Sequence, residues 1–191
     1  MSLNPSKIDY LLQAKDAINR PGYTLNIITG CKHGCEYCYA RRMVEHGRLK
    51  GHPSYPYGFE PTFHPERIRK YGGKPKLLFL NDMGDVGGDW KWNAVVPNNK
   101  GFGPSKLWQG GSPEYMAMQI RRFALLNPQH IILLLTKRPE WYGLAEWPDN
   151  VWCGFTATNK KQFLLGCIDL FKALNGNVSR TWISLEPWLD E

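Results

Sequence analysis

Residues 76–82 read KLLFLND, and this stretch decides the fold class. Its four consecutive apolar residues leave a strand without a polar face, which is typical of a strand buried on both sides in a parallel sheet. Four further segments have the composition and length of strands, namely YTLNIIT (23–29), HIILLLT (130–136), VWCGFTA (151–157) and TWISLE (181–186). We therefore predict five strands, all inside the protein.

The segments between these strands are predicted to be helices. Ser112 can cap a helix with Pro113 at its first position, and this helix then continues to Asn127. A second long helix is indicated by apolar residues at helical spacing, namely Phe163, Leu164, Cys167, Ile168, Phe171 and Leu174, with Gly176 as its stop. Shorter helices are expected at 36–46 and 139–147. Because strands that alternate with helices pair in parallel through right-handed crossovers, the sequence predicts an α/β fold.

Residues 86–111 show no periodicity and are rich in Gly, Pro, Trp and Asn, which predicts a long inserted loop. The loop follows the carboxyl end of the second strand, the edge of a parallel sheet where ligands bind, so we expect it to form a flap on the substrate side. The length of 191 residues suits one domain with residues 1–21 as an N-terminal extension.

The composition restricts the class of protein and its partners. Lys and Arg number 24 against 17 Asp and Glu, a formal charge of +7 that suits a polyanionic partner. The charges are spread along the chain, so an ordinary solvated basic surface is an equally good interpretation. No apolar stretch is long enough for a membrane span or a signal peptide, so we expect a cytoplasmic protein without membrane contact.

Residues 31–38 read CKHGCEYC and contain three of the five cysteines. In the reducing cytosol such a cluster indicates a metal or redox site rather than a disulfide framework. The cysteines follow the first predicted strand directly, so their thiols should lie at the carboxyl edge of the sheet. Cys153 lies within a strand and Cys167 on a helix face, and both are expected to be packing residues.

The three thiols leave two kinds of metal site open. A structural zinc site would need a fourth ligand, for which His33 and His46 are the nearest candidates. Zinc sites of this class usually draw on two close ligand pairs, and no second C-x2-C or H-x3-H pair occurs in the chain. Three thiolates fit better with an iron–sulfur cluster in which one iron is left open for a substrate or cofactor.

The C-x3-C-x2-C pattern, with Tyr37 just before the last cysteine, resembles the signature of the radical S-adenosylmethionine (radical SAM) superfamily. More narrowly, the chain resembles an uncharacterised phage-associated family within or beside that superfamily. This second resemblance covers about residues 22–190 and rests on YTLNIITGCKHGCEYCYARRM, FHPERI, LFLNDMGDV, LLLTKRPEW, NVWCGFTATN and WISLEPW, in that order.

The resemblance implies a partial, incomplete TIM-like βα barrel with about five parallel strands. It also implies that Cys31, Cys35 and Cys38 bind a [4Fe-4S] cluster whose fourth iron is chelated by S-adenosylmethionine. An electron from a flavodoxin- or ferredoxin-type donor would then cleave the cofactor to a radical that removes a hydrogen atom from the substrate. The charge and the phage association favour nucleic acid or a modified nucleoside as the otherwise unidentified substrate.

Further cofactor-binding residues follow from the same resemblance. Tyr37 is expected beside the adenine, and Asp82 or Asp85 is expected to bind the methionine amino group. Polar residues at the ends of later strands are expected at the same edge, namely Thr136, Lys137, Thr156, Thr158 and Glu186. A cation such as Lys137 or Arg138 would pair with the methionine carboxylate. The alternative is that these strand-end residues are caps and edge residues.

The chain ends soon after its fifth predicted strand, whereas relatives continue through another strand and helix. Five parallel strands cannot close a barrel, so we expect the outer edge of residues 181–186 to be covered by a partner or to be exposed, with a more open site in both cases. A non-catalytic binding module stabilised by zinc or a cluster is therefore the alternative to a radical SAM enzyme.

Overall fold

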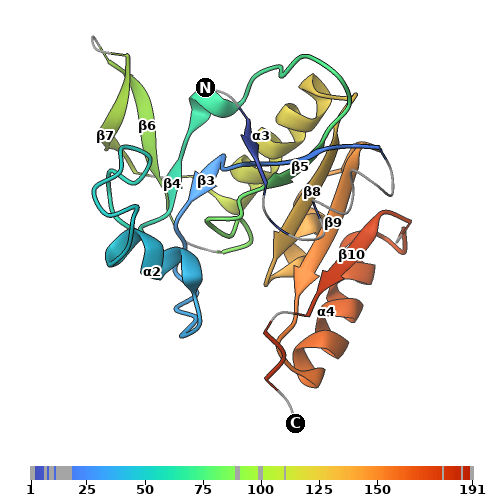
Figure 1. Cartoon of the computed structure of the whole chain (residues 1–191). Helices are drawn as coiled ribbons and strands as arrows, with labels where there is room; N and C mark the ends of the chain where they lie inside the picture. Colours follow the sequence, from blue (N-terminus) through green and yellow to red (C-terminus); the bar gives the residue numbers. More distant parts are fainter. Residues whose placement is uncertain are drawn as a thin grey trace.

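The protein is described by a computed structural model over residues 3–6, 8, 11, 19–88, 91–98, 101–109, 111–177, 179–185 and 187–189. Its main feature is a six-stranded sheet in the order β1-β2-β5-β8-β9-β10 (Figure 1). The strands are β1 (Asn4–Pro5), β2 (Gly22–Leu25), β5 (Leu77–Leu80), β8 (Ile131–Thr136), β9 (Val151–Thr156) and β10 (Thr181–Ser184). All five segments predicted as strands contribute to this sheet.

The strands from β2 to β10 pair in parallel, and only β1 pairs antiparallel, at the edge beside β2. The five parallel strands stand in the sheet in the same order as in the chain. The mixed α/β fold expected from the sequence is therefore confirmed. Among the described strands, β1 and β10 lie at opposite ends of the order without pairing, so the sheet is open.

Two long helices connect the strands where the sequence predicts them. α3 (Pro113–Leu126) begins after Ser112, whose side chain accepts a hydrogen bond from the Tyr115 N–H, and it ends at Asn127. α4 (Lys160–Ala173) is capped in the same way by Asn159. The shorter elements are α2 (Tyr39–Glu45) and two 3-10 helices, η1 (Pro65–Arg67) and η2 (Pro139–Leu144).

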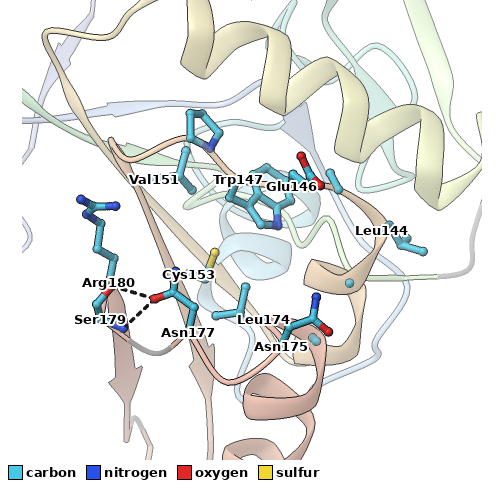
Figure 2. A pocket seen from close by; sticks show the side chains of 14 residues that line it. Leu144, Glu146, Trp147, Val151, Cys153, Leu174, Asn175, Asn177, Ser179 and Arg180 are labelled. Carbon is cyan, nitrogen blue, oxygen red and sulfur yellow. Dashed lines mark hydrogen bonds between the residues drawn. The ribbon is translucent and has the colours of Figure 1, made fainter.

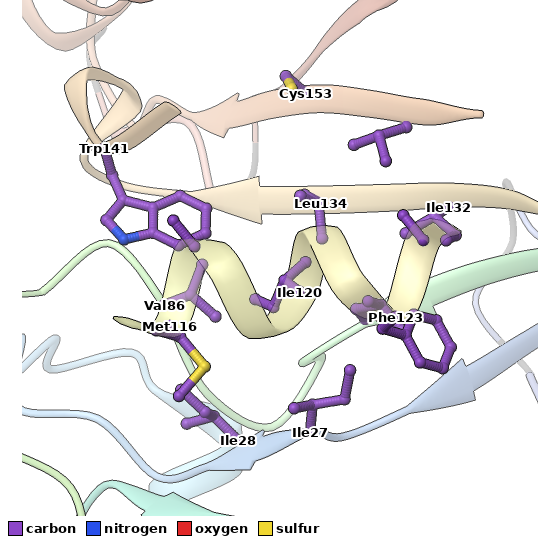
Figure 3. Packing of buried hydrophobic residues seen from close by; sticks show 14 of the residues in the cluster. Ile27, Ile28, Val86, Met116, Ile120, Phe123, Ile132, Leu134, Trp141 and Cys153 are labelled. Carbon is purple, nitrogen blue, oxygen red and sulfur yellow. The ribbon is translucent and has the colours of Figure 1, made fainter. Parts of the chain in front are cut away.

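The core lies between α3 and the sheet. Met116, Ile120 and Phe123 are fully buried and lie between β8 and the segment that contains Ile27 and Ile28 (Figure 3). The same cluster includes alternate residues of β5, β8 and β9 together with Leu170 of α4. The remaining side chains of β5 and β8 form a separate cluster with Leu11. The helices α3 and α4 therefore cover one face of the sheet, and Ile8 and Leu11 contact the other.

The packing face of α4 differs from the sequence prediction. Its buried residues are Gly166 and Leu170, whereas Leu164, Ile168 and Phe171 are 51%, 49% and 56% exposed. The reason is a close approach at Gly166, where an added Cβ would lie 2.3 Å from the Phe155 ring. The line of contact thus passes through Gly166, and three of the six predicted core positions point away from the sheet.

The stretch 86–111, predicted to be an irregular loop, contains a β-hairpin of β6 (Asn93–Asn98) and β7 (Gly101–Gln109). The hairpin extends a second sheet, in the order β3-β4-β6-β7, with β3 at Ile28–Thr29 and β4 at Thr62–Phe63. It projects at the upper left of Figure 1, away from β8, β9 and β10. The strands of the hairpin pair mainly with each other. They therefore lack most of the hydrophobic pattern by which a core strand is found in the sequence.

None of the described helices combines the length and the apolar character that a membrane span requires.

Candidate functional site

The three-cysteine loop, residues 31–38, begins where β3 meets the end of β5. Gly30 donates its N–H to the Met83 carbonyl at 2.8 Å and forms a parallel bridge with Gly84. Gly30 has φ +75°, and a Cβ there would lie 2.4 Å from the Phe59 carbonyl oxygen, so only glycine suits this position. This junction places Cys31 at the carboxyl edge of the main sheet.

The three thiols are free and half-buried. The Cys38 Sγ accepts a hydrogen bond from the Arg41 N–H at 3.3 Å and thereby caps α2. The pKa of Cys31 is raised to about 11, mainly by burial and also by the nearby Asp85, Cys38 and Cys35, against a backbone hydrogen bond from His33 that lowers it. Without a metal, Cys31 is therefore a protonated thiol at neutral pH, and a metal would have to displace this proton.

Among the described residues, no three His, Cys, Asp or Glu side chains are arranged as ligands of a single metal ion. His46, a candidate zinc ligand, is 80% exposed at the end of α2. His33, the other candidate, lies 3.1 Å from Asp85 instead. In a four-iron cluster each thiolate binds a different iron, so its ligands stand farther apart than those of one zinc ion.

Asp85 is 8% exposed and its carboxylate is surrounded by donors. Oδ1 accepts from the Thr136 hydroxyl at 2.6 Å and from the Gly87 N–H at 2.8 Å. Oδ2 accepts from the Lys137 N–H at 2.9 Å and lies 3.1 Å from His33 Nε2. Although burial acts to raise the pKa of Asp85, these partners lower it overall. Since both oxygens have two partners within the protein, Asp85 does not suit the predicted contact to a methionine amino group.

Asp82 is the better placed of the two predicted carboxylates. Its Oδ1 accepts from Asn26 Nδ2 at 2.7 Å, and its backbone carbonyl accepts from the Tyr39 hydroxyl at 2.6 Å, next to Cys38. Burial raises the pKa of Asp82, against hydrogen bonds that lower it. A half-buried carboxylate of this kind gains from a cationic ligand group, because the cation offsets the lost hydration.

Tyr37 and Lys137 are both predicted to bind the cofactor, and the structure brings them together. The Lys137 ammonium donates to the Tyr37 hydroxyl at 2.9 Å and lies 5.3 Å from the centre of its ring. The contact joins the cysteine loop to the end of β8. Tyr37 thus lies in the cysteine loop, one residue before Cys38, and a cation from the end of β8 holds its hydroxyl.

The remaining predicted residues separate into two groups. Thr136 is buried, and its hydroxyl donates a hydrogen bond to the Asp85 carboxylate. Thr158 is 2% exposed and donates to Gln162 Oε1 at 2.9 Å, so it serves the first turn of α4 and not a ligand. Thr156 is half-buried at the end of β9. Glu186 lies outside the described residues.

Next to the cysteine loop lies a buried polar network that the sequence did not predict. The Thr29 hydroxyl is 2.9 Å from His64 Nε2, and His64 Nδ1 is 3.6 Å from Glu66 Oε1. Arg67 Nε lies 3.3 Å from the same carboxylate oxygen, and its guanidinium also donates to the Asn26 carbonyl. Burial lowers the pKa of His64. Residues 63–68, FHPERI, therefore stabilise the segment that leads into the cysteine loop. The only sign of this role in the sequence is the unusual charge of the motif within a short apolar context.

A pocket of about 520 Å³ lies at the opposite edge of the sheet, where β9 and β10 begin (Figure 2). Trp147, Val151 and Leu174 line it, with Cys153 on the wall. Cys153 is 2% exposed and burial raises its pKa, as expected of a packing residue. Because ligands of parallel sheets bind beyond the carboxyl ends of the strands, the edge with the three cysteines is the better candidate site.

A family model described as "Protein of unknown function (DUF5131)" matches residues 15–191, so the chain belongs to this family. No curated protein and no solved structure matches the chain. The description of the family names no activity, and the function is therefore inferred from the site.

Proposed function

We propose that this member of the DUF5131 family is a radical SAM enzyme. In this proposal Cys31, Cys35 and Cys38 bind a [4Fe-4S] cluster, which supplies the electron that cleaves S-adenosylmethionine. The observation that carries the proposal is the position of the three thiols, on one loop at the carboxyl edge of the parallel sheet, beside Tyr37 and Asp82.

The residues around the thiols fit such a cluster. The donor set is three soft thiolates, and the Arg41 N–H already points at one of the sulfurs. The Cys31 and Cys38 side chains pack against an apolar cluster of Ala40, Val44, Tyr55, Phe59 and Met83. Such apolar surroundings limit the access of water to a cluster.

The chain's own side chains have definite tasks in this proposal. Asp82 would accept hydrogen bonds from the methionine ammonium, and the Tyr37 ring would lie along the adenine. Because the Lys137 ammonium has three N–H donors, it would pair with the methionine carboxylate while it keeps its hydrogen bond to the Tyr37 hydroxyl. The apolar cluster around Phe59 keeps water from the reacting groups.

The main sheet supports the proposal independently of the cysteines. Its parallel strands follow chain order, and α3 and α4 cover one face, an arrangement that a partial TIM-like barrel would also have. The net charge of +7 favours a polyanionic substrate, for which we propose nucleic acid or a modified nucleoside. A flavodoxin- or ferredoxin-type protein would supply the electron.

Anaerobic reconstitution with iron and sulfide tests the proposal. The protein should turn brown, bind about four irons per chain, and release 5′-deoxyadenosine from S-adenosylmethionine after reduction. Cys31→Ala, Cys35→Ala and Cys38→Ala should each abolish the cleavage, while Cys153→Ala and Cys167→Ala serve as matched controls that keep it. Colourless protein with one tightly bound zinc ion would instead support a non-catalytic binding module.

A further inference from the structure

Two contacts join the cysteine loop to the segments that follow β5 and β8. His33 lies between the first two cysteines, and its Nε2 is 3.1 Å from Asp85 Oδ2. The Asp85 carboxylate in turn accepts hydrogen bonds from the Thr136 hydroxyl and from the Lys137 N–H. Tyr37 lies between the second and third cysteines, and its hydroxyl accepts from the Lys137 ammonium at 2.9 Å. Each half of the loop is therefore held by a residue that follows one of two neighbouring strands, Asp85 after β5 and Lys137 after β8.

We propose that Asp85 and Lys137 act as positioning residues that set the spacing of the three thiols. Asp85 positions the half from Cys31 to Cys35 through His33, and Lys137 positions the half up to Cys38 through Tyr37. The four residues His33, Asp85, Tyr37 and Lys137 together form a loop clamp. The function given to the clamp rests on the proposed cluster, but the contacts themselves do not.

The first half of the loop depends on the clamp most. In the second half, the Cys38 N–H donates to the Cys35 carbonyl at 3.1 Å, so a turn already restrains the backbone there. In the first half, Gly34 has φ +70° and an added Cβ would have no atom within 4 Å, so the space around this residue is open. The His33 side chain provides a restraint at this point, because it is 17% exposed and directed at a buried carboxylate.

Asp85 is suited to anchor the loop because it cannot move by itself. Three donors at 2.6–2.9 Å hold its carboxylate within the fold, and they come from Gly87, Thr136 and Lys137. Hydrogen bonds to a buried carboxylate are stronger than those between neutral groups. His33 thus contacts a carboxylate whose position is fixed by the segments that follow β5 and β8. The spacing of the thiols therefore depends on the geometry of the sheet.

The first test uses the metal-free, reduced protein and needs no cluster. Alkylation of each cysteine by iodoacetamide is followed by mass spectrometry in wild-type protein and in His33→Ala, His33→Gln and Asp85→Asn. In His33→Ala, alkylation of Cys31 and Cys35 should become about tenfold faster, because loss of the contact with the buried carboxylate raises local opening by about that factor. Cys153 should react at the wild-type rate. His33→Gln retains an N–H near the position of Nε2 and should restore most of the protection.

Local and global effects are separated within the same experiment. In Asp85→Asn, the N–H groups of the new side-chain amide face hydrogen-bond donors and repel them. This variant should therefore accelerate alkylation of Cys31 at least as much as His33→Ala does. If all five cysteines became more reactive together, Asp85 would be a residue of general stability and the clamp would be refuted. Equal Cys31 rates in wild type, His33→Ala and the exposed control His46→Ala would refute it as well.

The second test uses the reconstituted protein and measures iron release to a ferrous chelator. His33→Ala should lose iron about tenfold faster than wild type and His46→Ala, with His33→Gln close to wild type. Unchanged release in His33→Ala would overturn the positioning role. If the wild-type protein took up no iron, the proposed function would fail, while the alkylation test would still decide whether the clamp holds the loop.

Discussion

Replacing Gly30 by alanine tests how much of the stability of the protein depends on a glycine at the start of the cysteine loop. The cost has a conformational part and a steric part. The residue has φ +75°, and an added Cβ would lie 2.4 Å from the Phe59 carbonyl oxygen and 2.6 Å from that of Glu60. The left-handed backbone conformation costs alanine about 1 kcal/mol relative to glycine. Two overlaps with backbone oxygens, which cannot rotate away, add about 1–3 kcal/mol. We expect a total destabilisation of about 3 kcal/mol.

Gly34→Ala is the matched control, because Gly34 lies in the same loop at φ +70° with nothing within 4 Å. It should cost only the conformational part, about 1 kcal/mol. For a chain of this size, thermal unfolding should show melting temperatures lower by about 6–12 °C for Gly30→Ala and by about 2–4 °C for Gly34→Ala. Equal melting temperatures for the two variants would refute the steric reasoning and the path of the chain from Gly30 into Cys31.

Three further predictions concern packing, charge and partner. On α4, Leu170→Ala should cost about 2–5 kcal/mol in chemical denaturation, and Ile168→Ala less than about 1 kcal/mol, because only Leu170 is buried; similar costs would contradict the observed packing face. Asp82→Asn should raise the melting temperature at pH 7 and have less effect at pH 3. The pKa of Asp82 is higher in the folded protein than the unfolded value of 3.8, so ionisation of Asp82 lowers stability as the pH rises through the folded pKa, and Asn avoids this loss. A gain no larger at pH 7 than at pH 3 would contradict this sign. Binding of single-stranded RNA or DNA, measured by mobility shift, should weaken at least about tenfold between about 50 and 200 mM salt, and absence of binding at low salt would remove nucleic acid as a partner.

The strands could be predicted because buried parallel strands carry their signal in their own composition. Leu77–Leu80 and Ile131–Thr136 are apolar on both faces, and the sequence locates both within a residue or two. The hairpin at 93–109 was missed because its strands are stabilised mainly by pairing with each other. The face of α4 was partly misassigned because helical periodicity cannot reveal that Gly166 approaches the Phe155 ring.

The site was predictable only in part for a related reason. The position of the cysteines followed from one strand and the loop after it, which are local in sequence. The role of Asp85 depends on Thr136, which is 51 residues after it, and on His33, which lies on an earlier loop, so no local pattern encodes the contacts. Thr158 matched the strand-end pattern equally well, but its hydroxyl bonds within the first turn of α4.

The most direct test of the central claim is an electron paramagnetic resonance spectrum of the reconstituted, reduced protein with and without S-adenosylmethionine. Three thiolate ligands leave one iron of the cluster without a protein ligand. The account therefore predicts a spectrum of a reduced [4Fe-4S] cluster whose g values shift when S-adenosylmethionine is added, and the absence of this spectrum in Cys35→Ala. A cluster whose spectrum is unchanged by S-adenosylmethionine, or a wild-type protein without any cluster signal, would contradict it.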